Sequence, residues 1–265
     1  NMAETLILTS TQQSRSDQNM KQTPNIKAII LAAGVGSRIK PMTDNCPKCL
    51  LKIGGVSILE RMLSNIQDCG ITEVIFVLGN LQKKIEDFVQ NSFPNLNHKF
   101  IVNNKYSETN TGYSLFLTEE YAKGSTFIKF DADVVFEISI LENLLSKGDH
   151  NWLCIDKNIQ LDAEEIKVVV DENNLIVKAS KTVLPQDSIG ESIGIEKISG
   201  DTTVLLYDEL KAMMSLPQNH NEYYESAYER LMKKGVPFYA MDITGLKWTE
   251  IDTVSDFQSA ENIFV

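Results

Sequence analysis

A strand-length apolar run at residues 27–31 leads directly into a loop with two closely spaced glycines, Gly34 and Gly36. Glycine lets the backbone turn sharply and approach a bound group, and successive N–H groups in such a loop can point toward one anion. Arg38 and Lys48 add positive charge to the same loop. A strand that ends in a basic, glycine-containing loop predicts an α/β fold whose first loop holds the phosphates of a nucleoside triphosphate.

Two common glycine loops do not fit this segment. The dinucleotide-binding fingerprint needs a third glycine where the chain has Ile39, and the Walker loop needs Gly-Lys-Ser/Thr after four spaced residues. A purely structural turn would explain the glycines and Pro41. It would not explain why two basic residues and Pro47 accompany them.

The rest of the chain alternates apolar runs of strand length with segments of helical period. Strands are expected at residues 27–31, 74–78, 100–102 and 126–130, and helices at 58–69, 81–89 and 111–121. This order predicts a doubly wound, mostly parallel sheet of the Rossmann-like type, with ligands at the carboxyl ends of the strands. After residue 136, short strands at 152–156, 167–170 and 175–179 predict a small β-subregion. Helices near 202–214 and 222–234, a strand at 236–242 and a helix from about 253 follow.

Composition limits the function classes. A chain of 265 residues with 43% hydrophobic content can bury one substantial core. Its net charge of -11 disfavours nucleic acid and anionic membrane surfaces as partners. Cys46 and Cys49 form a Cys-x-x-Cys spacing, but no second Cys pair or Cys/His cluster completes a zinc site. Scattered thiols fit a reducing cytoplasm, which is the expected location.

The two ends of the chain differ from the middle. Residues 1–25 are polar, and their apolar stretch at 6–8 is too short for a signal peptide or a membrane span. They are expected to form a tail, and Asn1 before Met2 resembles an expression scar. Val265 follows a helix-like segment directly, which suggests one domain of a longer protein.

The motifs together resemble a known family. Leu-Ala-Ala-Gly-x-Gly-x-Arg at 31–38, Pro-x-Thr at 41–43, Pro-Lys-x-Leu at 47–50 and the Gly-Gly turn at 54–55 resemble the signature of the nucleotidyltransferases that make NDP-sugars and CDP-alcohols. The resemblance spans residues 26 to about 263, and Cys49 is its one departure. It implies a nucleotidyltransferase domain at 26–265, with a nucleotide half at about 26–136 and an acceptor half at about 137–265.

The resemblance also assigns roles in the first loop and at a metal site. The implied nucleotide contacts are Leu31, Ala32, Ala33, Gly34 and Gly36, and the implied catalytic cations are Arg38 and Lys48. Asp133, at the end of the strand 126–130, and Asp252 are implied as ligands of the cofactor Mg²⁺, which uses few protein carboxylates. Asp131 would support the nucleotide. The alternatives are a structural Asp pair in a turn and a helix cap by Asp252, which Thr253 or Ser255 could provide instead.

Residues 103–115 resemble the base-recognition loop of choline-phosphate and related cytidylyltransferases, which favours CTP as the nucleotide. By analogy Gly112 would let the base pack against the backbone, and Ser114 or Thr111 would supply a hydrogen bond. A helix N-cap by Asn110 or Thr111 accounts for two of these residues equally well. Asn80 is assigned to the base by its position after a strand.

Ser180-Lys181 and Gly-Glu-Ser-Ile-Gly-Ile at 190–195 resemble the acceptor segment of the same enzymes. Lys181 would be a catalytic residue that holds the acceptor phosphate or phosphonate. Glu191 and Tyr223 would contact the cationic end of the acceptor. The further candidates at that end are Glu222, Tyr224 and Glu225, for which a solvated or packed helix face is an equal alternative.

We therefore expect a cytidylyltransferase that transfers CMP from CTP to a small zwitterionic acceptor and releases pyrophosphate. A phosphate or phosphonate oxyanion is already ionised near pH 7, so the attack needs no general base. A quaternary ammonium would need an aromatic cage, for which Trp152, Trp248, Tyr223 and Tyr224 are available, whereas a primary ammonium needs carboxylates. The more numerous carboxylates favour 2-aminoethylphosphonate, as in phosphonate-specific members, some of which are fused to a transaminase.

Three other functions stay open at this point. The first is a choline-phosphate cytidylyltransferase, which would use the aromatic candidates. The second is a sugar-1-phosphate nucleotidylyltransferase, which shares the glycine loop and the metal residues. The third is a non-catalytic, nucleotide-sensing homologue, against which the joint presence of Arg38, Lys48, Asp133 and Asp252 argues.

Overall fold

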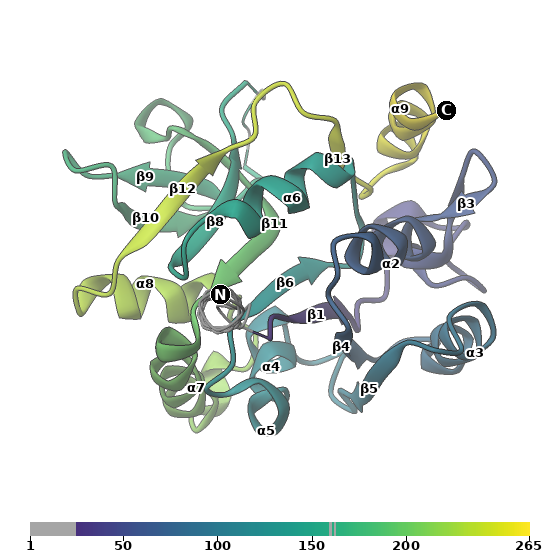
Figure 1. The fold of residues 1–265 in the computed structure, drawn as a ribbon, viewed down its shortest axis with the longest axis horizontal. Coiled ribbons are helices and arrows are strands. Elements are labelled where there is room, and N and C mark those ends of the chain that lie inside the picture. Colours follow the sequence, from purple (N-terminus) through teal and green to yellow (C-terminus); the bar gives the residue numbers. More distant parts are fainter. Residues whose placement is uncertain (1–24, 159–160, 162) are drawn as a thin grey trace, which may run out of the picture.

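The computed structural model describes residues 25–158, 161 and 163–265 (Figure 1). The tail predicted at 1–25 therefore lies outside the described residues, apart from Asn25. Among the described residues, no helix combines the length and the apolar character needed to cross a lipid bilayer.

Four parallel strands form the nucleotide half of the sheet. Their order across the sheet is β6 (Phe127–Asp131), β1 (Lys27–Ala32), β4 (Glu73–Leu78) and β5 (Asn97–Val102). The first three are apolar runs that are buried almost throughout, as expected for strands covered by helices on both faces. Because they run parallel, their carboxyl ends and the loops that follow meet at one edge.

The acceptor half continues the same sheet. Strand β11 (Gly190–Ile198) pairs antiparallel with β6, and also with β8 (Asn151–Asp156) and β9 (Lys167–Val170). Strand β10 (Ile176–Ser180) pairs with β9, and β12 (Phe238–Asp242) pairs with β8. The predicted β-subregion is thus joined to the parallel strands through β11. Residues 190–195 of this strand were assigned to acceptor binding by resemblance and were not predicted as a strand, because glycine and charged residues interrupt their apolar pattern.

Helices cover both faces of the sheet (Figure 1). One face carries α2 (Ile58–Asp68), α3 (Gln82–Ser92) and α6 (Ile138–Ser146). The other carries α4 (Thr111–Phe116), α5 (Glu119–Ala122), α7 (Gly200–Met214) and α8 (Glu225–Lys233). This two-sided cover confirms the predicted doubly wound architecture.

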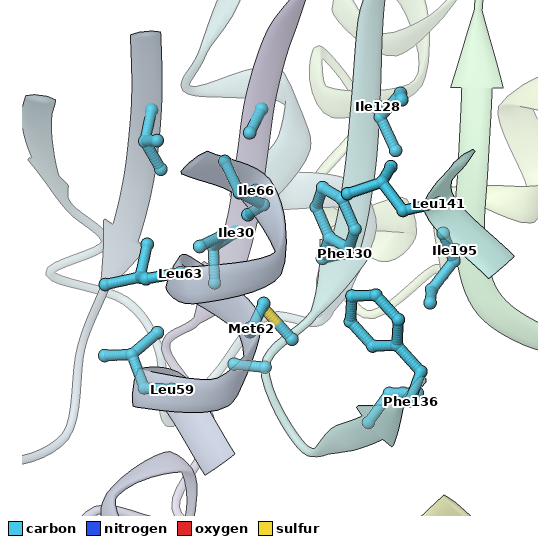
Figure 2. Close-up of a cluster of buried hydrophobic side chains, with 14 of the residues drawn as sticks. Ile30, Leu59, Met62, Leu63, Ile66, Ile128, Phe130, Phe136, Leu141 and Ile195 are labelled. Atoms are coloured by element: carbon cyan, nitrogen blue, oxygen red, sulfur yellow. The ribbon is translucent and has the colours of Figure 1, made fainter. Parts of the chain in front are cut away.

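Helix α2 shows how the sequence pattern produces the packing. Its buried residues Leu59, Met62, Leu63 and Ile66 recur at the spacing of one helical face. Figure 2 shows this face lying over the strands, next to Ile30 and within a cluster that includes Phe130 and Ile195.

Two predicted helices have different bounds. The helix expected at 111–121 is split into α4 and α5, because the Thr118 hydroxyl donates to the Leu115 carbonyl and pairs with the Tyr207 hydroxyl. The helix expected from 222 begins at Glu225, since residues 222–224 instead lie against the start of α4.

A short strand pair that the sequence analysis did not predict positions the metal residues. Strand β7 (Val134–Phe136) pairs antiparallel with β13 (Trp248–Glu250), and the Ile251 N–H donates to the Asp133 carbonyl at 3.0 Å. Each of the two strands has three residues, too few for a period to identify it. Their pairing joins two segments more than 100 residues apart in sequence.

Strands β2 (Lys52–Ile53) and β3 (Val56–Ser57) form a hairpin, with α9 (Val254–Phe264) nearby in Figure 1.

Candidate active site

A cavity of about 700 Å³ lies at the carboxyl edge of β1 and β6. Its walls come from the loop after β1, the loop before α4, strand β11, the start of α8 and the segment after β13. Most of the predicted site residues line it: Leu31, Ala32, Ala33, Gly34, Arg38, Lys48, Thr111, Ser114, Asp131, Asp133, Lys181, Glu191, Tyr223 and Asp252. Gly36 lines a smaller adjoining pocket of about 190 Å³ with Arg38 and Lys48.

The glycine loop is held open by local geometry. Gly36 adopts a left-handed conformation with φ of 65°, and its carbonyl accepts a hydrogen bond from the Thr43 hydroxyl at 2.7 Å. A Cβ on Gly34 would meet nothing within 4 Å, so this glycine faces open space. The loop can therefore admit a bulky anion close to its backbone.

Lys48 lies between two acidic residues. Its ammonium is 2.6 Å from Asp133 Oδ2 and 2.8 Å from Asp252 Oδ1. Burial alone would lower the pKa of Lys48, but the two carboxylates outweigh burial and raise it, so the side chain keeps its positive charge. Arg38 contacts the other oxygen of Asp252 at 2.7 Å.

Asp252 is available as a ligand because another residue caps the helix that follows it. Thr253 accepts from the Asp256 N–H, and Asp256 accepts from the Thr253 N–H, which completes a capping box for α9. Burial opposes the charge of Asp252, but Lys48 and Arg38 overcome that cost and lower its pKa.

Three carboxylates are arranged to hold a divalent cation. Ligand oxygens of Asp133, Glu250 and Asp252 all lie within 4.8 Å of one another. An all-oxygen donor set of this kind suits Mg²⁺, which completes its octahedron with water and phosphate oxygens. The residues therefore fit the implied cofactor. Glu250 is absent from the sequence-based prediction, although the segment 249–257 that contains it was singled out, because Asp252 alone matched the family pattern.

The loop at residues 103–115, for which base recognition is predicted, is organised by a buried amide. The Asn103 side chain donates to the Thr109 hydroxyl at 3.0 Å and the Ser114 hydroxyl at 3.2 Å, and accepts from the Lys105 N–H at 2.9 Å. Asn103 and Tyr106 line the cavity although neither was among the predicted site residues. Their place in the Asn-x-x-Tyr pattern was the signal that could have identified them.

Two predicted nucleotide contacts lie beside the cavity without being among the residues that line it. A Cβ on Gly112 would be 2.7 Å from the Glu222 carbonyl, so this glycine permits close packing against residues 222–223. Asn80 follows β4, and its N–H approaches the carbonyl of Ala33, a cavity-lining residue, at 3.4 Å. Their assignment to the nucleotide stays a prediction.

Lys181 lies close to the phosphate loop. Its ammonium is 3.3 Å from Glu164 Oε2, the same oxygen that Arg38 contacts at 3.3 Å, and it lies 5.3 Å from the centre of the Tyr223 ring. Burial would lower the pKa of Lys181, but Tyr223 and Glu164 raise it overall. Lys181 and Arg38 can thus contact two anions held side by side.

Glu191 is buried on β11, where it pairs in register with Asp156 of β8. Asp156 also lines the cavity and accepts a hydrogen bond from the Trp248 indole at 2.7 Å. Trp152, the other tryptophan proposed for an aromatic cage, packs against Tyr239 and is not among the cavity-lining residues.

Asp131 is held by two buried side chains of the cavity wall. Its Oδ2 lies 2.9 Å from the Lys129 ammonium and accepts from the Tyr224 hydroxyl at 3.0 Å. The Lys129 side chain is wholly buried and is also paired with Glu196 at 2.9 Å. Asp131 therefore anchors one wall of the cavity from within the protein.

The two cysteines of the Cys-x-x-Cys spacing, Cys46 and Cys49, are free thiols. The one group of three or more His, Cys, Asp and Glu side chains that could hold a metal ion, among the residues that the structure describes, contains neither of them. Burial raises the pKa of Cys49 to about 12.

Comparisons with known proteins agree with the fold and the site. Residues 28–159 match the MobA-like NTP transferase domain. The chain is 26% identical over 245 residues to a choline-phosphate cytidylyltransferase of Streptococcus pneumoniae, which covers 90% of this chain and 98% of the relative. It is 28% identical over 256 residues to a CTP:phosphoglutamine cytidylyltransferase of Campylobacter jejuni, covering 88% and 98%.

Other relatives share only part of their length with this chain. A bifunctional IPC transferase and DIPP synthase of Aquifex aeolicus is 28% identical over 247 residues, which is 90% of this chain and 51% of that protein. A CMP-5'-(3-aminopropyl)phosphonate synthase of Streptomyces rubellomurinus is 32% identical over 119 residues, 45% of this chain and 19% of the relative.

Solved structures resemble the whole fold. The structure of the CTP:phosphocholine cytidylyltransferase LicC of Streptococcus pneumoniae matches with a TM-score of 0.72 at 20% identity, covering 91% of this chain and 99% of that one. The glycine loop, the basic residues on the phosphate side and the domain match all point to one enzyme class. The chain belongs to the nucleotidyltransferase family, with a MobA-like NTP transferase domain at residues 28–159.

Proposed function

We propose that the protein is a cytidylyltransferase that transfers CMP from CTP to a small acceptor carrying a phosphonate or phosphate and an amine, with 2-aminoethylphosphonate as the preferred acceptor. The observation that carries this proposal is the grouping of Arg38, Lys48 and Lys181 with three carboxylates at the wall of one cavity. CTP is favoured because the relatives matched over nearly their whole length are cytidylyltransferases by name.

The phosphate side of the cavity supports in-line attack on the α-phosphorus of CTP. Lys181 holds the anionic end of the acceptor, and Arg38 lies close enough to hold a phosphate beside it, since both contact the same Glu164 oxygen. Two anions that repel each other in water are thereby held near one another, which removes much of the cost of their encounter.

Lys48, the third cation at the cavity wall, stabilises negative charge that develops during the transfer. Lys48 keeps its proton, as its raised pKa indicates, and it can donate to oxygens that become more negative as pyrophosphate leaves. Asp133, Glu250 and Asp252 would hold Mg²⁺. When bound, the ion would neutralise phosphate charge and orient the triphosphate.

The distribution of acceptor-side residues favours an amine over a sugar. Glu191, Asp156 and Glu225 line the cavity, so its acceptor end is rich in carboxyl groups. Carboxylates accept N–H bonds from an ammonium group at full strength. A sugar-1-phosphate would use them as acceptors for neutral hydroxyls, which gain less from a buried charge.

Pyrophosphate release in the presence of Mg²⁺ tests the proposal. CTP and UTP are each combined with 2-aminoethylphosphonate, phosphocholine and glucose 1-phosphate, and a reaction without acceptor gives the background. We expect release with CTP and 2-aminoethylphosphonate well above every other pairing. Faster release with UTP and the sugar phosphate would replace the proposal by a sugar nucleotidylyltransferase, and release equal to background in all pairings would reject it.

A further inference from the structure

A group of charged residues beneath the acceptor end of the cavity contains more carboxyl groups than ammonium groups. Lys129 lies on β6, and its ammonium contacts the carboxylates of Asp131 and Glu196, each at 2.9 Å. The Tyr224 hydroxyl donates to Asp131 and to Glu196, at 3.0 and 3.1 Å, and also bonds to Lys129. Glu225 is close enough to this group to interact with Lys129.

Glu225 is the incomplete member of this group. The residue is only 5% exposed, it lines the cavity, and its Oε2 has no hydrogen-bond partner among the described residues. Burial raises the pKa of Glu225 to about 8, and Lys129 offsets this effect only in part, while Glu196 and Asp131 add to it. Three carboxyl groups thus share one ammonium, and within the part of the chain that the structure describes no second cation forms an ion pair with Glu225.

The aromatic faces at this end of the cavity are already occupied by cations of the protein. The Lys129 ammonium lies 3.9 Å from the centre of the Tyr224 ring, and the Lys181 ammonium lies 5.3 Å from that of Tyr223. Trp152 does not line the cavity. Of the four aromatic residues considered for a cage, only Trp248 lines the cavity without a lysine over its ring among the described residues. A quaternary ammonium gains most when several aromatic faces surround it.

A carboxyl oxygen that is buried without a partner requires an N–H or O–H donor. A primary ammonium offers three N–H donors, whereas a quaternary ammonium offers none. We infer, on the basis of the proposed function, that Glu225 binds the primary ammonium of the acceptor by charge-assisted hydrogen bonding and thereby selects primary amines over quaternary ones.

The position of Glu225 fits a short acceptor. Only Tyr224 separates it from Tyr223, whose ring lies beneath the Lys181 ammonium, so the Cα atoms of Tyr223 and Glu225 are at most about 7 Å apart. The residues that contact the anionic end and the cationic end of the acceptor therefore come from neighbouring parts of one wall.

Three acceptors that share a phosphonate group isolate the amine when kcat/KM is expressed per phosphonate dianion, because a nearby ammonium lowers the second pKa of the phosphonate. They are 2-aminoethylphosphonate, ethylphosphonate, which lacks the amine, and the N,N,N-trimethyl derivative of 2-aminoethylphosphonate. With CTP and Mg²⁺, we expect kcat/KM for the primary amine to exceed that for each of the other two by about ten- to a hundredfold, as for loss of a hydrogen bond to a charged group. A preference for the trimethyl compound, or equal values for all three, would overturn the inference while leaving cytidylyl transfer intact.

The variant Glu225→Gln tests the residue itself. We expect it to reduce the preference for the primary amine over ethylphosphonate to within a few-fold, mainly through a higher KM for the primary amine. The matched control is Glu229→Gln on the same helix, whose carboxylate accepts the Ala179 N–H and does not line the cavity. An unchanged preference in Glu225→Gln, or an equal loss in Glu229→Gln, would assign the amine to another residue.

Binding separates this inference from the proposed function. 2-Aminoethylphosphonate is titrated calorimetrically into the protein in the presence of the α,β-methylene analogue of CTP, so no turnover is required. A dissociation constant about ten- to a hundredfold weaker in Glu225→Gln supports the amine contact even if pyrophosphate release fails. Equal affinity in the two proteins contradicts it.

Discussion

At the scale of single residues, the proposed function makes Lys48 the cation on which transfer depends most directly. It is held between Asp133 and Asp252 and keeps its charge. Lys48→Ala should lower kcat by on the order of a hundredfold, because one preorganised contact to the developing charge is lost. Lys52→Ala, at an exposed position on β2, is the control and should leave turnover unchanged. Near wild-type kcat in a folded Lys48→Ala protein would remove this role, with thermal unfolding as the check on folding.

Glu225 predicts how acceptor binding depends on pH. Its pKa of about 8 means that it is mostly protonated at pH 6, where it cannot act as a charged acceptor. The ionised fraction rises about tenfold per unit as pH increases toward 8, while an alkyl ammonium with a lysine-like pKa stays charged. The groups that face Glu225 are Lys129, Asp131, Glu196, Tyr224 and Tyr228. Lys129 lowers the pKa of Glu225, whereas Glu196 and Asp131 raise it.

The measurement is the KM for 2-aminoethylphosphonate between pH 6 and pH 8, divided by the KM for ethylphosphonate at the same pH. Each KM is first multiplied by the fraction of that acceptor present as the dianion, taken from a ³¹P NMR titration of the compound, because the ammonium lowers the second pKa of 2-aminoethylphosphonate relative to that of ethylphosphonate. The ratio should fall by up to about tenfold per unit, and the slope should vanish in Glu225→Gln. A ratio that rises with pH has the wrong sign for a carboxyl group that must lose a proton.

At the scale of elements, Gly194 is where β11 makes room for Asp131. A Cβ at this position would lie 2.5 Å from Asp131 Oδ2, and φ is 76°. Gly194→Ala should therefore displace Asp131 from Lys129 and Tyr224 and lower kcat/KM at least tenfold. Gly235→Ala has a similar φ of 84° but nothing within 4 Å of the added Cβ. It should show only the loss of stability from backbone strain, about 1–2 kcal/mol, with kcat/KM unchanged. Equal kinetic losses in the two variants would deny Gly194 its local role.

Lys129 joins three elements, because its partners lie on β6, β11 and at the start of α8. Lys129→Met keeps the apolar volume but leaves Asp131 and Glu196 buried with no cation. Loss of one partner of a buried ion pair costs about 3–5 kcal/mol. Chemical denaturation should show this loss at neutral pH. A change below 1 kcal/mol would mean that the two carboxyl groups are neutral in the folded protein.

At the scale of the whole molecule, regular elements were predictable and contacts between distant segments were not. The periods of strands β1, β4 and β6 and of helix α2 identify them directly, because their buried faces are long enough to repeat. The β7–β13 pair and the interrupted strand β11 carry too few periodic residues. Their structure depends on pairing with segments far away in the sequence.

The candidate site shows the same limit: local motifs could be predicted from the sequence, but contacts between distant segments could not. The glycine loop, Asp133 and Asp252 follow from local motifs that the cavity brings together. Glu250 joins the metal residues only through the β7–β13 pairing, and the unpaired state of Glu225 depends on the folded surroundings of α8. The motif position of Gly112 led to its assignment to the base, whereas its close packing against residues 222–223 depends on a contact between distant segments.

The most direct test of the central claim is a ³¹P NMR spectrum of the complete reaction with CTP, Mg²⁺ and 2-aminoethylphosphonate. The account predicts equal amounts of pyrophosphate and of a product in which the phosphonate phosphorus is coupled to the α-phosphorus of CMP. It also predicts that both signals grow about a hundredfold more slowly in Lys48→Ala. A spectrum in which CTP stays intact, or is hydrolysed to CMP with the phosphonate signal unchanged, would contradict it.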